Sequence, residues 1–329
     1  MMIKRSYMKF KIQLLLYVDD LSCPDGKPTR FIRLPLLFRD MDVDLDIVYK
    51  KDLKFFCLRY LKFRPDVVLT VGPVPGAVAA FYKKIGLVRV PLVHDWTDDY
   101  VDMFGASHGI FRSGLLEYFT IQNSDIIVSP SKFRETRCKM INKKVKYIPH
   151  GVNAGFDKVK KRELGGKGKV KIVFAGVITR LKGTDKIAKA VNGLDCDLHL
   201  FGRINDNHFP TELFKTPNVH FHGLVNHKEM PGYIKAADIL VITADDDCTL
   251  KMFDYVKAGK CILSIRGRAC YFLTHGVDAY ITDDLRGGLM ELIKNKKLRT
   301  KLSKNVKKIK IRTWNEIAEE YINFLRGLI

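Results

Sequence analysis

The sequence predicts an α/β protein with two doubly wound parallel sheets, one in each half of the chain. Apolar strand-like runs alternate with helix-like segments in both halves, as is typical of βαβ units and parallel sheets. The 329 residues correspond to about two domains of ordinary size. A basic, glycine-containing segment at 158–169 is poor in apolar residues and has the composition of an interdomain linker.

The strands are expected where short apolar runs end at glycine, proline or polar residues. In the first half these runs are 10–18, 43–49, 66–71, 90–94, 125–129 and 145–148, with helices at 76–84 and 131–141. In the second half the strands are 170–175, 197–201, 219–222, 239–243 and 261–265, with helices at 183–192, 228–236 and 250–257. A last amphipathic helix is expected at 313–325.

Composition excludes several classes of protein. Seven cysteines without a CxxC pair offer no disulfide or zinc framework and indicate a reducing compartment. No charge-free apolar run reaches the ~18 residues of a membrane span, and we interpret the basic N-terminal segment as a first strand instead of a signal peptide. We therefore expect a cytoplasmic protein, if membrane-bound then peripheral at the inner face. No GxGxxG follows the first strand, which argues against a dinucleotide-dependent oxidoreductase.

Charge is the outlying property of the composition. The chain has 57 Lys and Arg against 36 Asp and Glu, a net charge of +21, which attracts nucleic acid, acidic lipid or acidic glycans. Residues 294–312 include many basic and no acidic side chains. Residues 50–64 alternate basic with apolar side chains at near-helical spacing. The second segment predicts either a basic helix on a membrane surface or, more commonly, a core-packing helix with a solvated basic face.

The segment 246–260, DDCTLKMFDYVKAGK, carries the strongest functional signal. Thr249 is a favoured N-cap residue, and Gly259 ends the expected helix. The free N–H groups and positive dipole of a helix N-terminus suit an anion. Lys251 lies beside those groups, and Asp254 shares its helix face. A diphosphate and a pair of ribose hydroxyls would fit this arrangement, although spacing alone equally describes an ordinary surface helix with a Lys–Asp pair.

This segment resembles the donor-binding helix of the GT-B glycosyltransferases of family-4-like type, the glycosyl transferases group 1. In that family two acidic residues, separated by seven residues, precede an Ala/Cys-Gly-Lys turn; here they are Asp246 and Asp254, where the family usually has Glu. FAGVITRLKG, residues 174–183, is similar to the family's GRLxxxKG segment. The resemblance assigns Gly176 and Lys182 to the donor diphosphate, with Arg180 near the place of the family arginine.

Other matches extend the resemblance along the chain. Gly223 would lie near the nucleobase, and Gly26 is the one glycine of the first loop, where the family usually has two. HDWTDD at 94–99 is similar to a D-W/Y-x-D-D segment, which places His94 and Asp95 near the transferred sugar or the acceptor hydroxyl. TWNEIAEEYINFL, 313–325, resembles the final helix that crosses back to the first domain. Asp245 to Asp247 mimic a DxD metal motif, but in this family lysines and helix dipoles stabilise the diphosphate.

The resemblance implies two Rossmann-like domains facing a cleft: an acceptor domain 1–157, a linker 158–169, a nucleotide-sugar domain 170–312 and a returning helix 313–329. It implies retaining, metal-independent transfer of a hexose from a UDP- or GDP-linked donor, without a cofactor, to an acceptor hydroxyl. From the charge we expect a glycan or glycolipid acceptor at an anionic membrane. The alternatives are a DNA-modifying glycosyltransferase and a non-catalytic protein that binds anions or nucleotide sugars. The expected catalytic residues are His94, Asp95, Lys182 and Lys251, and the expected donor-binding residues are Gly26, Gly176, Arg180, Lys182, Gly223, Asp246, Thr249, Leu250, Lys251 and Asp254.

Overall fold

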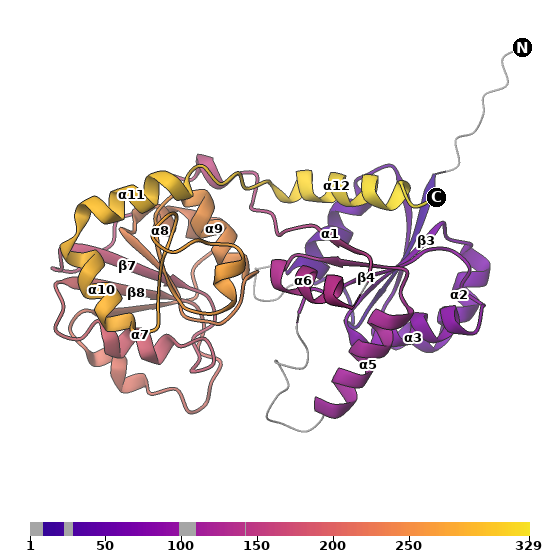
Figure 1. Ribbon diagram of the computed structural model, residues 1–329, viewed down its shortest axis with the longest axis horizontal. Helices are drawn as coiled ribbons and strands as arrows, with labels where there is room; N and C mark the ends of the chain where they lie inside the picture. The colour runs from indigo at the N-terminus through magenta and orange to yellow at the C-terminus, as the bar shows by residue number, and fades with distance from the viewer. Residues whose placement is uncertain (1–8, 23–28, 99–109, 142) are drawn as a thin grey trace, which may run out of the picture. The chain divides into compact units, whose positions relative to one another are not determined.

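Two compact units make up the chain in a computed structural model that describes residues 9–22, 29–98, 110–141 and 143–329 (Figure 1). The first unit comprises Met1–Pro149 and Trp314–Ile329, and the second comprises His150–Thr313. Each unit contains a six-stranded sheet in which all neighbouring strands are parallel. The α/β fold class with two doubly wound sheets is therefore confirmed. No helix of the described residues is long and apolar enough to cross a membrane.

The first sheet has the strand order β2-β1-β3-β4-β5-β6. The chain leaves β1 on one side to form β2 and returns on the other side to form β3, so the topological switch point lies between β1 and β3. The strands are β1 (Phe10–Leu16), β2 (Val43–Val48), β3 (Val67–Val71), β4 (Leu92–Asp95), β5 (Ile126–Ser129) and β6 (Val145–Tyr147). The helices are α1 (Arg30–Arg39), α2 (Phe56–Phe63), α3 (Pro73–Lys84), α5 (Ile110–Asn123), α6 (Lys132–Met140) and α12 (Trp314–Arg326).

The last helix belongs to the first unit. Its buried stripe includes Trp314, Ile317, Tyr321 and Leu325, at the spacing of one helix face. It packs beside α1, and the rings of Phe38 and Tyr321 lie 5.7 Å apart (Figure 1). This is the returning helix of the expected fold.

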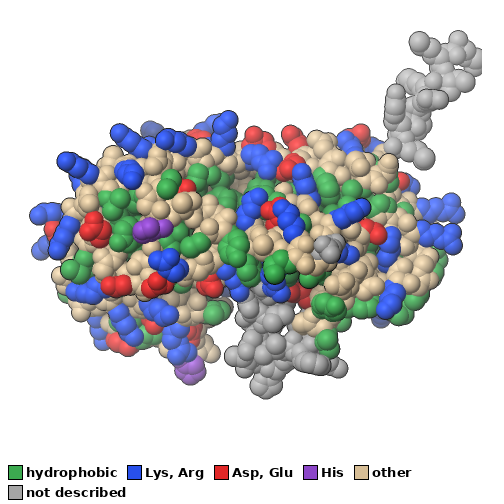
Figure 2. All heavy atoms as spheres, viewed as in Figure 1, with side chains coloured by type: hydrophobic (Ala, Val, Ile, Leu, Met, Phe, Trp, Pro, Cys, Tyr) green, Lys and Arg blue, Asp and Glu red, His purple; other side chains and the backbone are tan. Residues whose placement is uncertain are grey.

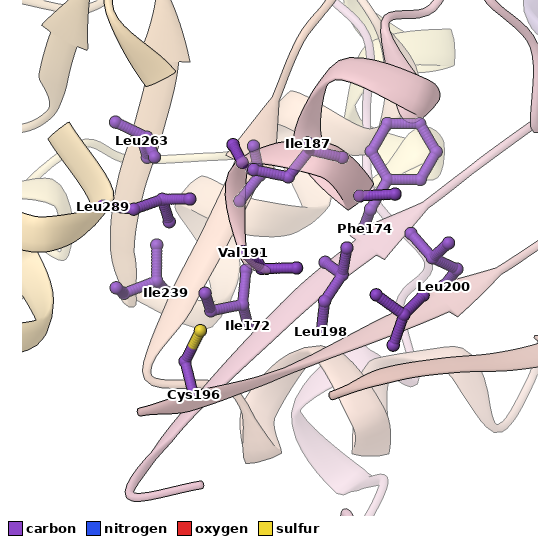
Figure 3. Close-up of a cluster of buried hydrophobic side chains, with 14 of the residues drawn as sticks. Ile172, Phe174, Ile187, Val191, Cys196, Leu198, Leu200, Ile239, Leu263 and Leu289 are labelled. Atoms are coloured by element: carbon purple, nitrogen blue, oxygen red, sulfur yellow. The ribbon is translucent and has the colours of Figure 1, made fainter. Parts of the chain in front are cut away.

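The second sheet has the order β12-β11-β10-β7-β8-β9, with its switch point between β7 and β10. The strands are β7 (Val170–Ala175), β8 (Cys196–Phe201), β9 (Val219–Gly223), β10 (Ile239–Ile242), β11 (Cys261–Ile265) and β12 (Tyr280–Thr282). The helices are α7 (Thr184–Ala190), α8 (Met230–Ala236), α9 (Leu250–Ala258), α10 (Leu285–Lys294) and α11 (Lys296–Val306). Figure 3 shows one core face, where Ile172, Leu198 and Ile239 of the strands meet Ile187 of α7 and Leu289 of α10.

The segment 158–169 lies inside the second unit, and the division between units comes earlier, at Pro149 and His150. Backbone bonds hold the segment in place: Arg162 N donates to Gly232 O at 3.1 Å. The Lys235 ammonium donates to the carbonyls of Phe156, Asp157 and Val159. A linker-like composition therefore coexists here with a fixed path along α8.

Candidate functional site

Glycines end the three strands on one side of the second switch point. Gly176, Gly202 and Gly223 follow or close β7, β8 and β9, all with positive φ, at 141°, 148° and 66°. Gly176 N donates to Phe201 O at 2.8 Å, and Gly202 N donates to Gly223 O at 2.8 Å. A Cβ on Gly202 would overlap the carbonyl oxygen of Gly176. The sheet edge is thus bare backbone, to which a ligand can approach closely.

Lys251 lies across this edge. Its side chain is 7% exposed, and its ammonium is 3.6 Å from the centroid of the Phe174 ring at the end of β7. A Cβ added to Gly176 would lie 3.2 Å from Lys251 Nζ. The ring face stabilises the cation electrostatically. The structure therefore brings Gly176 and Lys251, predicted from separate motifs, into direct proximity.

Tyr255 fixes the helix that carries Lys251. Its buried hydroxyl accepts a hydrogen bond from Ala175 N at 2.8 Å, so α9 is joined to the last residue of β7. Burial raises the pKa of Tyr255 well above its ordinary value, which keeps this hydroxyl neutral. Sequence reasoning missed Tyr255, although a tyrosine one turn after Lys251 on an amphipathic helix is a signal for such an anchor.

The loop that follows β7 is anchored to the other side of the switch point. The Thr243 hydroxyl, just after β10, donates to the Lys182 carbonyl. The Lys182 ammonium is half-buried and makes no hydrogen bond or ion pair with the part of the chain that the structure describes. Lys182 therefore has a fixed backbone and an available charge.

Arg180 is less available than its neighbour. Its guanidinium pairs with Asp206 at 3.0 Å, and its backbone N donates to the same carboxylate at 3.1 Å. These bonds from Arg180 lower the pKa of Asp206 to about 2, and they raise the pKa of Arg180. A donor phosphate would have to compete with Asp206 for this arginine.

The N-terminus of α9 carries the remaining predicted donor residues. Thr249 is the N-cap residue, its side chain makes no capping bond, and its backbone carbonyl accepts from Met252 N at 3.0 Å. Asp246 turns onto its own loop and accepts from Cys248 N at 3.0 Å. Leu250 and Asp254 are half-buried, with Asp254 one turn beyond the first residues of the helix. The predicted residues of this segment thus surround one helix end.

The acidic run before α9 is divided in its contacts. Asp245 accepts from Arg268 N at 2.6 Å, so its carboxylate faces the loop after β11. Possible ligand atoms of Asp246, Asp247 and Cys248 lie within 4.8 Å of one another. The arrangement leaves the expectation of metal independence untested.

The predicted residues of the first unit are deeply buried. His94 is 1% exposed, its Nδ1 lies 2.9 Å from Thr70 Oγ1, and burial lowers its pKa to about 3. Asp95 forms an ion pair with Arg30 at 2.9 Å and accepts from the Tyr321 hydroxyl at 3.1 Å. These contacts give Asp95 a structural task, holding α1 and α12. The catalytic role of both residues stays a prediction, and Gly26 lies outside the described residues.

A family comparison decides the class of the second unit. Residues 169–295 match the family model described as Glycosyl transferases group 1. This part of the chain is a group 1 glycosyltransferase domain. The glycosyltransferase domain contains Gly176, Lys182 and Lys251, and the chain is accordingly an enzyme of the glycosyltransferase class.

Solved structures agree with the GT-B fold of the whole glycosyltransferase. Sucrose-phosphate synthase from Thermosynechococcus elongatus has a TM-score of 0.78 at 14% identity, covering 97% of this chain and 99% of that one. Anabaena HepE, solved with UDP and glucose, has 0.72 at 13%, covering 97% and 100%. The lipopolysaccharide outer core galactosyltransferase WaaB has 0.66 at 10%, covering 97% and 100%. No curated protein sequence matches the chain.

Proposed function

We propose that the protein transfers a hexose from a UDP-linked donor to an acceptor hydroxyl, with retention at the anomeric carbon and without a metal. The observation that carries the proposal is the position of Lys251, held against Gly176 and the Phe174 ring at the switch point of the second sheet. Ligands of doubly wound sheets bind at such points. The UDP and glucose bound to HepE support UDP as the base to test first.

Each donor residue has a task in this mechanism. The bond between the anomeric carbon and the diphosphate oxygen breaks through an oxocarbenium-like transition state. Lys182, Lys251 and the N–H groups at the start of α9 stabilise the departing diphosphate, because fixed positive groups act most strongly where negative charge develops. Asp254 holds the ribose hydroxyls, and Asp246 contacts the transferred sugar. The backbone edge at Gly176 and Gly202 lets the donor approach closely.

The acceptor of the proposed reaction lies at an anionic membrane surface. The 3₁₀ turn η1 (Lys50–Phe55) and α2 expose apolar side chains, with Phe55 48%, Leu58 68% and Leu61 54% exposed. Lys51, Lys54 and Lys62 are exposed among them. Phe56 is instead fully buried, and Arg59 is paired with Asp46 and Asp52, so the membrane-facing set is narrower than the sequence pattern. Such a surface suits a glycolipid or lipid-linked glycan acceptor.

Thermal shift with UDP, GDP and ADP sugars tests the donor, since a ligand raises the melting temperature in proportion to its affinity. We expect stabilisation by UDP-hexose, unchanged by EDTA, and transfer of labelled sugar to a membrane lipid extract. Stabilisation only in the presence of Mn²⁺ or Mg²⁺ would overturn metal independence. Binding of the donor without turnover would leave a nucleotide-sugar-binding protein. Transfer to duplex DNA instead of lipid would favour the DNA-modifying alternative.

A further inference from the structure

The first unit has an open groove of about 650 Å³ that the donor site does not use. Its walls come from segments that follow three adjacent strands. Tyr17 follows β1, Lys50 follows β2, and α3 follows β3. The groove therefore lies at the carboxyl edge of the sheet, at the β1/β3 switch point, where doubly wound sheets bind ligands.

The lining of the groove is apolar apart from two lysines. Leu53, Val74, Ala77, Val78, Phe81, Tyr82 and Leu116 supply the apolar wall. Lys50 and Lys54 are the charged residues of the lining, and both are exposed. The Lys50 ammonium is 5.0 Å from the centroid of the Tyr17 ring. No acidic side chain is part of the lining, so the groove is complementary to an anion attached to an apolar chain.

The surface around the groove continues the same chemistry. Phe81 at the groove is 51% exposed, and Ile85 just after α3 is 58% exposed. Leu115 and Tyr118 on the neighbouring α5 are 53% and 62% exposed. With Phe55 and Leu58 these side chains form a contiguous set of elements, since α3 packs on both α5 and η1. Apolar exposure on this scale marks a ligand or membrane contact.

We infer that this groove binds the acceptor as a single-chain amphiphile, with its alkyl or isoprenoid chain against α3 and its phosphate at Lys50 and Lys54. The inference rests on the proposed function for the identity of this ligand as an acceptor, but not for its binding. The membrane surface of α2 and the groove have different tasks: the first holds the enzyme on the bilayer, and the second selects one lipid from it.

Binding of monomeric dodecyl phosphate to the full chain, measured by isothermal titration calorimetry, tests the groove. Inorganic phosphate and dodecyl maltoside separate the contributions of headgroup and chain. We expect one bound dodecyl phosphate, and little binding of either comparison compound. Lys50→Gln and Lys54→Gln should each weaken binding about fivefold, the effect of one basic residue near an anionic lipid. Lys62→Gln, the same change on exposed α2 outside the groove, should leave binding unchanged.

A steric variant gives an independent measurement. Ala77→Trp adds a large side chain to the groove wall and should abolish dodecyl phosphate binding. Stabilisation by UDP-glucose reports that the variant is folded and its donor site intact. Equal weakening by Lys62→Gln, or equal binding of inorganic phosphate or dodecyl maltoside, would overturn the inference. Dodecyl phosphate binding without any UDP-sugar binding would refute the proposed function and leave the groove standing.

Discussion

Lys251 owes its position to residues that are not charged. The Phe174 ring lies under its ammonium, Gly176 leaves room for it, and the Tyr255 hydroxyl fixes its helix to β7. A lysine constrained in this way presents its charge at one place, so little reorganisation is needed when a diphosphate arrives.

Replacing Lys182 or Lys251 with Ala should lower kcat by roughly 10²–10³, by analogy with the loss of one donor to a developing anion. Lys186→Ala is the matched control, because Lys186 is an exposed lysine on α7, close in sequence to Lys182. Steady-state transfer kinetics with the donor identified by thermal shift would measure the effect. Near-native kcat in both Lys182→Ala and Lys251→Ala would remove the proposed donor site.

His94 makes the stability of the protein depend on pH. Burial lowers its folded pKa to about 3, below the value of about 6.5 in an unfolded chain. The unfolded state therefore binds a proton that the folded state excludes as pH falls from about 6.5 toward 3, and each such proton costs up to ~1.4 kcal/mol per pH unit. Stability from this group is complete above pH 6.5 and is lost on acidification.

Urea unfolding between pH 7.5 and 5 would show this slope, and His94→Gln should reduce it. His208→Gln is the control, since His208 is exposed. An equal slope in His94→Gln and the native chain would show that other groups cause the acid sensitivity.

At the scale of elements, the ends of β7, β8 and β9 form one device. Gly202 on β8 contacts the backbone of Gly176 on β7 and bonds to Gly223 on β9. One residue with a side chain would separate the three ends. The sequence already contains the signal for Gly202, because each of these strands is followed or closed by glycine, but the close contact between neighbours requires the sheet order.

Gly202→Ala should destabilise the protein by about 3 kcal/mol or more, because strain at φ 148° adds to overlap with Gly176. Gly193→Ala isolates the first term: Gly193 has φ 73°, and a Cβ there would meet no atom within 4 Å. Its expected cost is about 1 kcal/mol. Free energies of unfolding in urea would compare them. Equal losses in the two variants would show that backbone strain alone is responsible.

Helix α12 is held by a buried charge network. Tyr321→Phe removes the hydroxyl that donates to Asp95 and should cost about 1.5–3 kcal/mol. Arg30→Met leaves Asp95 without its cation and should cost about 3–5 kcal/mol. Asn323→Ala, an exposed change on the same helix, should be nearly neutral. Thermal melts of the full chain would rank the three, and an undiminished melting temperature in Arg30→Met would contradict a stabilising role for the network.

Local patterns predict some of these elements and not others. The donor helix, expected at 250–257, is Leu250–Ala258, and the following strand is Cys261–Ile265 as expected, because cap residues and an apolar run bound them. The partners of Asp95 could not be predicted, since Arg30 and Tyr321 are 65 and 226 residues away in sequence. Residues 50–64 divide into η1 and α2 because Phe56 and Tyr60 pack into the core while Phe55 and Leu58 do not.

At the scale of the molecule, the positive charge is spread over both units. Figure 2 shows lysine and arginine side chains across the visible face, and α11 lines its own groove of about 810 Å³ with Lys296, Lys297, Lys301, Lys304 and Lys308. The net charge of +21 therefore predicts attraction to many acidic surfaces. Only the α2 surface combines such lysines with exposed Phe55, Leu58 and Leu61 among the features described above.

Sedimentation with liposomes would separate general attraction from docking. We expect binding to anionic vesicles, loss at high salt through screening, and no binding to neutral vesicles. Lys51→Glu with Lys62→Glu should weaken binding by one to two orders of magnitude, at about 1 kcal/mol or more per residue. Lys167→Glu with Lys186→Glu makes the same change in net charge on exposed residues of the second unit. Equal weakening by both pairs would indicate attraction without a defined surface.

The interrupted first unit also sets the order in which the chain can mature during translation. Residues 150–313 are continuous and form the second unit, whereas the first unit needs α12, which the ribosome adds afterwards. Because domains generally fold as units while the chain is still growing, the nascent first unit must wait with Phe38 uncovered and Asp95 without the Tyr321 hydroxyl. Chaperones would therefore meet the N-terminal part of this protein for longer than the part made after it.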